Sequence, residues 1–238
     1  MRHRVAQADV PEIQASGRTE RGPDGWRATW PAVAWCTAFS GTSVSVLTQD
    51  ASAYHVEIDG REMDSIAPSE QRTESWYRGV PSGDHLIEII RKNVTRTAPG
   101  QFFGFKLESD DRWLPPPARL ARQIEFIGDS HSAAYGDLST SPDCDDDAIP
   151  SLSDASRSYA VLTAKQIHAD WQLNAMYAVG LARAIATILT IARLPWMFCS
   201  YLVGNPARLA GTRIAEYARA AARLQALDRR ALQARERP

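Results

Sequence analysis

Cysteine, net charge and long hydrophobic segments are all scarce in this sequence, and each shortage excludes a class of protein. The three cysteines, Cys36, Cys144 and Cys199, lie far apart, so they indicate neither a disulfide framework nor a metal site. Phosphate binding needs a basic face, and a net charge of -1 argues against one, so we expect no nucleic-acid partner. The apolar segment at residues 184–192 is too short to cross a membrane, so we expect no membrane partner.

The polar segments give no sign of a bound metal. The loop at residues 141–147 carries several carboxylates, but it lacks the regular ligand spacing and the turn glycine of calcium loops. We therefore expect no metal and no other cofactor. Residues 1–13 contain basic side chains and an Ala-x-Ala triplet without an apolar core segment, which leaves a signal-peptide remnant and a disordered terminus as alternatives. We predict the disordered terminus.

Residues 14–112 have the pattern of an all-β domain. Short alternating segments are separated by Gly, Pro, Asp and Ser, and no helical period is sustained. Many such strands must pair into two packed sheets to cover their apolar faces, and we predict a jelly-roll β-sandwich. The clearest strands are residues 26–30, 42–47, 54–58 and 85–90, with turns expected at residues 59–60 and 82–84.

Three aromatic residues of this domain allow two interpretations. On an exposed face, Trp26, Trp76 or Tyr77 could stack on sugar rings, because an aromatic face complements the C–H groups of a pyranose. Alternatively, each of them belongs to the core or to an edge of the sandwich. We keep the second interpretation as the default, because the sequence does not reveal which face these three residues occupy.

The second half of the chain has the pattern of an α/β layer. Residues 113–121 include Pro115, Pro116 and Pro117, and we expect this stiff segment to be a linker that does not continue the sheet. A buried strand is then predicted at residues 123–127, a helix from Ser158 to Ala169, and a further strand at residues 171–177. This order implies a parallel sheet within residues 122–183.

The predicted strand at residues 123–127 ends in Gly128-Asp129-Ser130, where the chain can turn sharply into a helix. Ligands of α/β folds bind at the carboxyl ends of strands, which places Ser130 for chemistry. The alternative is an ordinary turn glycine followed by a helix N-cap.

These pieces together resemble carbohydrate esterase family two, whose members join a jelly-roll domain to an SGNH-type, or GDS-type, hydrolase domain. The resemblance covers about residues 17–183. It implies a β plus α/β protein, in which the jelly-roll β-sandwich is followed by an incomplete SGNH-type three-layer α/β/α domain. The matching stretches include residues 17–18, 30–31, 39–43, 54–60, 83–85, 102–105, 124–130, 158–159 and 169–173.

The resemblance also implies an activity and a set of site residues. The family removes acetyl groups from plant polysaccharides such as xylan or glucomannan, in secreted or periplasmic proteins. Ser130 matches the nucleophile, and its backbone N–H would donate to the oxyanion. Gly180 is the candidate for a second oxyanion donor, and Asp129 is expected to order the turn rather than to act as a base.

Two parts of the family's machinery have no counterpart in this sequence. A Gly-x-Asn-Asp block and a late Asp-x-x-His are missing, and the histidines stand at positions 3, 55, 85, 131 and 168. His131 follows the nucleophile directly, and its side chain is expected to point away. We therefore predict an acetyl-polysaccharide esterase with impaired activity. The alternative is a carbohydrate-binding or structural jelly-roll protein with a degenerate hydrolase segment.

Residues 184–238 differ in composition from the rest of the chain. They are rich in alanine and arginine, contain few acidic residues and have no lysine. A pair of helices that closes the α/β layer would explain this composition. We favour a second hypothesis, that this tail is translated in a shifted reading frame, because one back-translation of residues 183–206 continues the family pattern in another frame.

Overall fold

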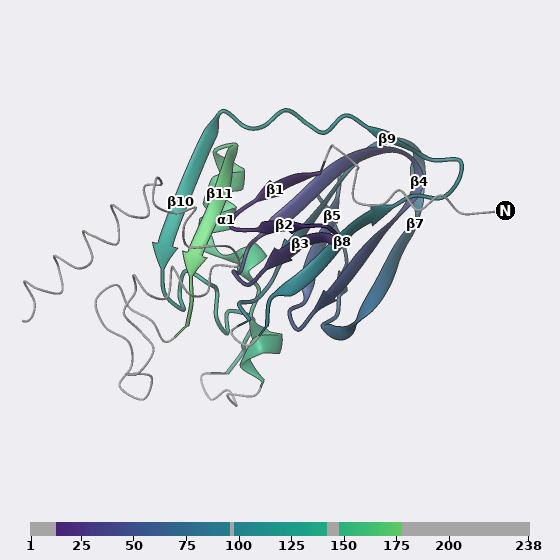
Figure 1. The fold of residues 1–238 in the computed structure, drawn as a ribbon. Coiled ribbons are helices and arrows are strands. Elements are labelled where there is room, and N and C mark those ends of the chain that lie inside the picture. The colour runs from purple at the N-terminus through teal and green to yellow at the C-terminus, as the bar shows by residue number, and fades with distance from the viewer. Residues whose placement is uncertain (1–12, 96–97, 142–147, 178–238) are drawn as a thin grey trace, which may run out of the picture.

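The computed structural model describes residues 13–95, 98–141 and 148–177, which form a bent β-sheet and a small α/β unit beside it (Figure 1). Nine strands of the described residues belong to the bent sheet. They are β1 (Gln14–Ser16), β2 (Glu20–Gly22), β3 (Gly25–Ala28), β4 (Ala34–Asp50), β5 (Tyr54–Ile58), β6 (Arg61–Ile66), β7 (Ser69–Arg91), β8 (Gly100–Lys106) and β9 (Arg112–Leu114).

Two long antiparallel strands, β4 and β7, organise this sheet. The sheet has the order β2-β3-β8-β4-β7-β5-β6, and β1 and β9 also pair with β4. The first half of β4 pairs with β1 and β9 on one edge, whereas its second half pairs with β8 on the same edge. Between these halves the β4–β7 register shifts at Gly41 and Ser43. Such an irregularity bends a strand, so the halves of the sheet close on each other like a sandwich.

Aromatic side chains fill the space between the two halves. Trp35 of β4 packs against Phe102 of β8 with ring centroids 4.8 Å apart, and against Tyr54 of β5 at 6.2 Å. Trp26 and Tyr77 are 6% and 7% exposed and belong to the same core, so they are not available to stack on sugars. Trp76 is partly exposed, and the Arg78 guanidinium lies 4.4 Å from its ring centroid.

The described residues confirm most of the expected strands and correct three details. The strand expected at residues 54–58 is β5, and Asp59 and Gly60 make the turn to β6 with φ values of 53° and 74°. Residues 82–84 do not separate two strands, because they lie within β7, close to the register shift. The expected strands at residues 42–47 and 85–90 are likewise parts of the long strands β4 and β7.

The linker is the third correction. Trp113 and Leu114, expected to leave the sheet, lie in β9 and pair with Phe39 and Ala38 of β4. The three prolines follow immediately, and no strand forms again until residue 122. The stiff segment is therefore shorter than the sequence indicates, because pairing with β4 satisfies the backbone up to the first proline.

A buried ion pair joins the carboxyl ends of β4 and β7. Arg91 and Asp50 form a bidentate contact, with Nε to Oδ2 at 2.7 Å and Nη2 to Oδ1 at 2.8 Å, and the Arg91 side chain is 0% exposed. Asp50 also accepts the Tyr54 hydroxyl at 2.6 Å and the backbone N–H of Ser52 at 2.8 Å. A Cβ at Gly100 would overlap the Asp50 carboxylate, so β8 can approach only with glycine there.

The remaining donors of Arg91 hold two loops of the sandwich. Its Nη1 donates to the carbonyl oxygens of Thr29 and Asn93, and its Nη2 donates to the Thr95 hydroxyl at 2.7 Å. The backbone N–H of Ala32 donates to the Arg91 carbonyl at 2.8 Å. Every one of these polar groups is buried or partly buried. The hydrogen bonds between them offset the free-energy cost of removing the two charges from water.

The α/β unit consists of two strands and one α-helix within the described residues. Strands β10 (Arg122–Gly128) and β11 (Ala169–Ala175) are parallel, and the helix α1 (Tyr159–Gln166) connects them after the 3-10 turns η1 (Ile149–Leu152) and η2 (Ala155–Arg157). The Ser158 hydroxyl caps α1 by accepting the Val161 N–H at 3.3 Å. The predicted β-α-β order is confirmed, and the expected three-layer α/β/α domain is only partly visible.

Three predictions for this unit differ from the structure. Helix α1 ends at Gln166, three residues before the predicted end at Ala169. Strand β11 begins two residues earlier than predicted, because His168 takes a left-handed φ of 52° and turns the chain out of α1. The strand predicted at residues 123–127 is confirmed as β10, but the prediction that it is buried is wrong for the described residues. Ile124 and Phe126 face the core, whereas Gln123, Glu125 and Ile127 on the other face are exposed.

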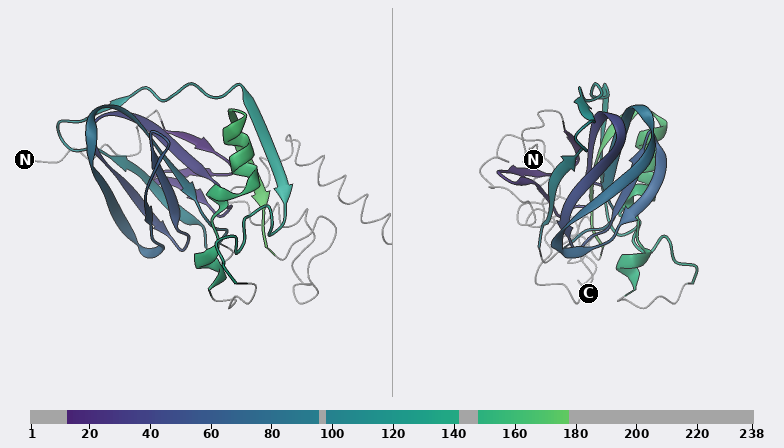
Figure 2. Two further views of the ribbon diagram at one scale, coloured as in Figure 1. Left: turned by 180° about the vertical axis from the view of Figure 1, so that it is seen from behind. Right: turned by 90° about the vertical axis from the view of Figure 1, so that its right-hand side faces the viewer.

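The α/β unit packs directly on the sandwich (Figure 2). Ala160 and Val161 of α1 and Leu173 of β11 share one core with Ala34 and Ile90 of the sandwich. The Trp171 indole N–H donates to the carbonyl oxygen of Ala32 at 2.8 Å, which links β11 to a loop held by Arg91. The two parts therefore meet through a mixed apolar and polar interface.

Charged side chains add a second link between α1 and the sandwich. The Lys165 ammonium contacts Glu57 of β5 at 2.8 Å and Glu88 of β7 at 3.0 Å. Glu57 also accepts a hydrogen bond from His55 at 3.0 Å. The hydrogen bond from His55, followed by that from Lys165, lowers the pKa of Glu57 from 4.5 to about 2 against the opposing effect of burial.

Across the described part of the chain, no helix is long and apolar enough to span a membrane.

Replacement of Arg91 by methionine should destabilise the whole sandwich. The variant leaves the Asp50 carboxylate buried without its cation, and we expect the free energy of unfolding to fall by roughly 3 to 5 kcal/mol. Urea denaturation monitored by tryptophan fluorescence measures this loss. The exposed hairpin residue Arg61 provides the control, since Arg61→Met should cost less than about 0.5 kcal/mol. Equal effects of the two substitutions would contradict the central role of the pair.

The Glu57 carboxylate should make the free energy of unfolding decrease as the pH falls into the acid range. Its pKa is depressed in the folded state, so its contribution is present above pH 4.5 and is lost as the pH falls toward 2. We expect Glu57→Gln to be less stable than the parent at pH 7 and the two curves to converge near pH 2. Urea unfolding at several pH values tests this. Parallel curves, or the same behaviour for the exposed Glu70→Gln, would contradict the assignment.

Candidate active site

The turn after β10 begins with a glycine that makes room for a neighbouring serine. A Cβ at Gly128 would overlap the side chain of Ser132, which folds back over the strand end and is 5% exposed. The Ser132 Oγ lies 2.8 Å from the Tyr159 hydroxyl at the start of α1. The Tyr159 ring in turn packs edge-on against Phe126 of β10, with centroids 6.2 Å apart. Gly128, Ser132 and Tyr159 thus hold the turn against α1.

Consecutive turns follow Ser130 in place of the expected helix. The Asp129 carboxylate accepts the backbone N–H of His131 at 3.0 Å, and the Asp129 carbonyl accepts that of Ala133 at 3.1 Å. The N–H of Tyr135 donates to the Ser130 carbonyl at 3.0 Å. These bonds have mixed spacing, so they do not continue as an α-helix. Ser130 itself is partly exposed.

An aromatic stack brings this turn to the end of the neighbouring strand. Tyr135 and Tyr177 lie nearly parallel, at an interplanar angle of 15° and a centroid distance of 4.6 Å. Tyr177 follows β11, whose last residue Ala175 is the register partner of Gly128. Ser130 therefore lies where two parallel strands end, the position at which α/β folds bind ligands.

The described histidines are distributed over four places. His55 bonds to Glu57, and His85 lies 2.6 Å from Asp59 within the sandwich. Burial opposes protonation of His85, but the hydrogen bonds that its imidazole donates to the Asp59 carboxylate and to the Pro81 carbonyl outweigh burial and raise the pKa of His85. The His131 side chain is 92% exposed, with its Nδ1 3.5 Å from the Asp129 carboxylate, and His168 lies in the turn before β11.

Other expected site features have different outcomes. Gly180, the candidate second oxyanion donor, lies outside the described residues, as do the acidic loop at residues 142–147, Cys144 and Cys199. Within the described ranges, no group of three or more His, Cys, Asp and Glu side chains could hold a metal ion. Burial raises the pKa of the Cys36 thiol to about 12, so Cys36 is unsuited to act as a nucleophile.

The sequence did not indicate the residues that support the turn. Ser132 and Tyr159 come from separate segments and meet only because α1 lies beside β10. Asn174 was also missed: it is 2% exposed near the end of β11, and its side-chain amide donates to Glu125 of β10 at 2.5 Å. The only sequence signal for Ser132 is its position two residues after Ser130.

Similarity to known proteins follows the same division of the chain. Residues 15–117, which include all of the bent sheet except Gln14, match the family model described as Carbohydrate esterase 2 N-terminal. The chain resembles carbohydrate esterase family two over part of its length. A solved family two carbohydrate esterase from Clostridium thermocellum, in complex with cellohexaose, is similar with a TM-score of 0.72 and 25% identity. The match covers 84% of this chain and 60% of that one.

Curated relatives show the same partial match to the family. An acetylxylan esterase / glucomannan deacetylase of Cellvibrio japonicus is 30% identical over 162 residues, which are 68% of this chain and 44% of that protein. The cellulase/esterase CelE of Acetivibrio thermocellus is 28% identical over 177 residues, 73% of this chain and 21% of that protein. The chain thus spans less than half the length of these two relatives. The predicted resemblance to family two is confirmed for this part.

Replacement of Gly128 by alanine should distort the turn through a clash with Ser132. We expect a loss of about 2 kcal/mol in the free energy of unfolding, typical of overpacking at a buried site. Adding Ser132→Gly removes the overlapping atoms, so the second substitution should cost less in the Gly128→Ala background than in the parent. Thermal unfolding of the four proteins measures this coupling.

Gly83 supplies the matched control for this cycle. A Cβ at Gly83 would meet its nearest neighbour, the His85 Nε2, at 3.9 Å, which is ordinary contact. Gly83→Ala should therefore change the midpoint little. Additive effects of Gly128→Ala and Ser132→Gly would show that the two positions do not touch in solution.

Proposed function

We propose that this chain comes from an acetyl-polysaccharide esterase lineage of the SGNH type, with Ser130 as its nucleophile. The observation that carries the proposal is the position of Ser130 in the turn after β10, beside the end of the parallel strand β11. The esterase names of the relatives support the reaction class. The proposed substrates are acetylated plant polysaccharides or oligosaccharides such as xylan and glucomannan, acted on outside the cell or in the periplasm.

The proposed reaction is the transfer of an acetyl group to serine and then to water. The Ser130 Oγ attacks the carbonyl carbon of the acetyl ester and a base takes its proton. The tetrahedral oxyanion collapses, the polysaccharide hydroxyl leaves with a proton, and acetyl-Ser130 remains. Water then attacks this ester and releases acetate. The Ser130 backbone N–H is proposed as one oxyanion donor and Gly180 as a second, while Asp129 orders the turn.

We further propose that a polypeptide of these 238 residues has strongly reduced activity. No histidine follows His168 in the sequence, and the histidines of the sandwich are engaged by Glu57 and Asp59. Without an imidazole at Ser130, the hydroxyl stays protonated at neutral pH. Loss of a triad member typically lowers the rate by several orders of magnitude.

The proposed domain organisation follows from the same resemblance. The sandwich is assigned to residues 14–114 with a jelly-roll topology, because β9 ends at Leu114. The linker is assigned to residues 115–121 and the SGNH-type segment to residues 122–183. Residues 1–13 form a terminus, and residues 184–238 form a tail, for which the shifted reading frame remains our hypothesis. Sequencing the encoding DNA and translating all frames beyond Arg183 tests that hypothesis. If no frame encodes Gly-x-Asn-Asp or Asp-x-x-His, the hypothesis is wrong.

A non-catalytic glycan-binding protein is the second candidate. It is favoured by the engagement of His55 and His85 within the sandwich, away from the turn that carries Ser130. Binding of xylan or glucomannan without release of acetate would support this candidate over the first.

Added imidazole should restore part of the activity if Ser130 is the nucleophile. Imidazole supplies the base that the chain lacks, so acetate release from acetylated xylo-oligosaccharides should rise at least tenfold with its concentration near pH 7. Chromatographic quantification of acetate measures this. Ser130→Ala should abolish the rise, whereas the exposed Ser109→Ala should retain it. A rise that survives in Ser130→Ala would sink the nucleophile assignment.

A further inference from the structure

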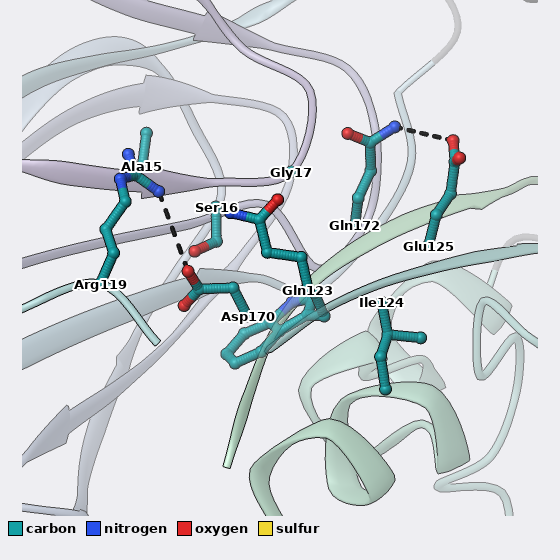
Figure 3. A pocket seen from close by; sticks show the side chains of 10 residues that line it. Ala15, Ser16, Gly17, Arg119, Gln123, Ile124, Glu125, Asp170 and Gln172 are labelled. Atoms are coloured by element: carbon teal, nitrogen blue, oxygen red, sulfur yellow. Dashed lines mark hydrogen bonds and ion pairs between the residues drawn. The ribbon is translucent and has the colours of Figure 1, made fainter. Parts of the chain in front are cut away.

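A cavity of about 470 Å³ lies between the sandwich and the α/β unit, near the amino ends of β10 and β11. Ser16 and Gly17 of β1 and the loop after it form one wall, and Arg119 of the linker forms another. The floor is formed by the first residues of β10 and β11, among them Gln123 and Asp170 (Figure 3). A cavity of this volume falls in the range of small-molecule sites.

The side chains that line this cavity offer hydrogen-bond donors and acceptors, both charged and neutral. The Asp170 carboxylate lies 3.9 Å from the Arg119 guanidinium, which is an ion pair but too long for a direct hydrogen bond. Gln172 donates to Glu125 at 3.0 Å. Figure 3 shows the Gln123 amide turned toward Ser16, above the Asp170 carboxylate. The described lining therefore combines two amides, two carboxylates and one guanidinium.

This chemistry selects among classes of ligand. Two carboxylates and one guanidinium leave the lining with a small negative charge, which disfavours phosphates and other anions. The lining has no histidine or cysteine, and the described residues hold no cluster suited to a metal. A neutral molecule with several hydroxyl groups fits best, because each hydroxyl can donate to a carboxylate or amide oxygen and accept from an amide or guanidinium.

The cavity is separate from the turn that carries Ser130. Glu125 is the last residue of β10 that lines the cavity and Gly128 ends the strand, so the two are separated by three residues, or roughly 10 Å at 3.3 Å per residue. Ser130 lies further on, at the carboxyl ends of the strands. A ligand in the cavity would therefore occupy a second site and would not take part in the reaction.

We propose that this cavity is an accessory glycan site that binds one or two unsubstituted pyranose units of a neutral polysaccharide. The ligand class rests on the proposed function, whereas the cavity and its chemistry do not. Hydroxyl groups of the sugar would bridge the gap between Asp170 and Arg119, and would bond to the amides of Gln123 and Gln172. Because its walls come from β1, the linker and the α/β unit, an occupied site would also hold the two parts together.

Titration with cellohexaose and xylohexaose tests the site directly. Neither sugar carries an ester, so isothermal titration measures binding without any turnover, and failure of the esterase proposal leaves this test unaffected. We expect binding with a dissociation constant of about 1 mM or tighter. Gln123→Ala and Asp170→Asn should each weaken it at least tenfold. Gln123 is exposed, so its substitution should not disturb folding, and near-ultraviolet circular dichroism checks this for both variants.

Three controls make the outcome decisive. Gln71→Ala changes an exposed glutamine of the sandwich that does not line the cavity, and it should bind both sugars like the parent. Ser130→Ala should also bind normally. The uniformly anionic hexagalacturonate should bind at least tenfold more weakly than the neutral sugars. No binding of either neutral sugar by the parent, or unchanged binding in Gln123→Ala and Asp170→Asn, would overturn the proposal.

Discussion

The buried ion pair between Arg91 and Asp50 sets the arrangement of the sandwich. It ties the ends of the two longest strands, and its remaining hydrogen-bonding groups hold Tyr54 and two loops in place. Glycine is required at position 100, since the carboxylate fills the space of a side chain there. A buried charge pair stabilises the fold only when each of its polar atoms has a hydrogen-bond partner. The segments that supply these partners are therefore held in place together.

The constraint extends from the sandwich to the α/β unit. One of the loops held by Arg91 contains Ala32, whose carbonyl accepts the Trp171 indole N–H of β11. Lys165 adds a charged contact from α1 to Glu57 and Glu88. The position of β11, and with it the strand end beside Ser130, therefore depends on contacts that the sandwich provides. This dependence explains how a small two-stranded unit keeps a defined position.

The same arrangement separates two kinds of surface on the α/β unit. The carboxyl ends of its strands carry the turn with Ser130, held by Ser132 and Tyr159. The amino ends form a polar cavity with β1 and the linker. Both sites use the parallel pairing of β10 and β11, but with opposite ends of the strands. One small sheet therefore carries the proposed nucleophile at one end and the proposed glycan site at the other.

Local patterns in the sequence determined much of the fold. Alternation predicted β5, the Asp59-Gly60 turn was evident from residue type, and the apolar segment before Gly128 predicted β10 and the position of Ser130. These features depend on neighbours in the chain, so the sequence carries them directly. The bend of β4 and β7, the burial of Trp26 and Tyr77, and the exposed face of β10 depend on distant partners. Only the tertiary structure decided these features. The same holds for the Arg91 network, the Ser132–Tyr159 contact and the cavity at Asp170, because each forms only when residues far apart in the sequence meet.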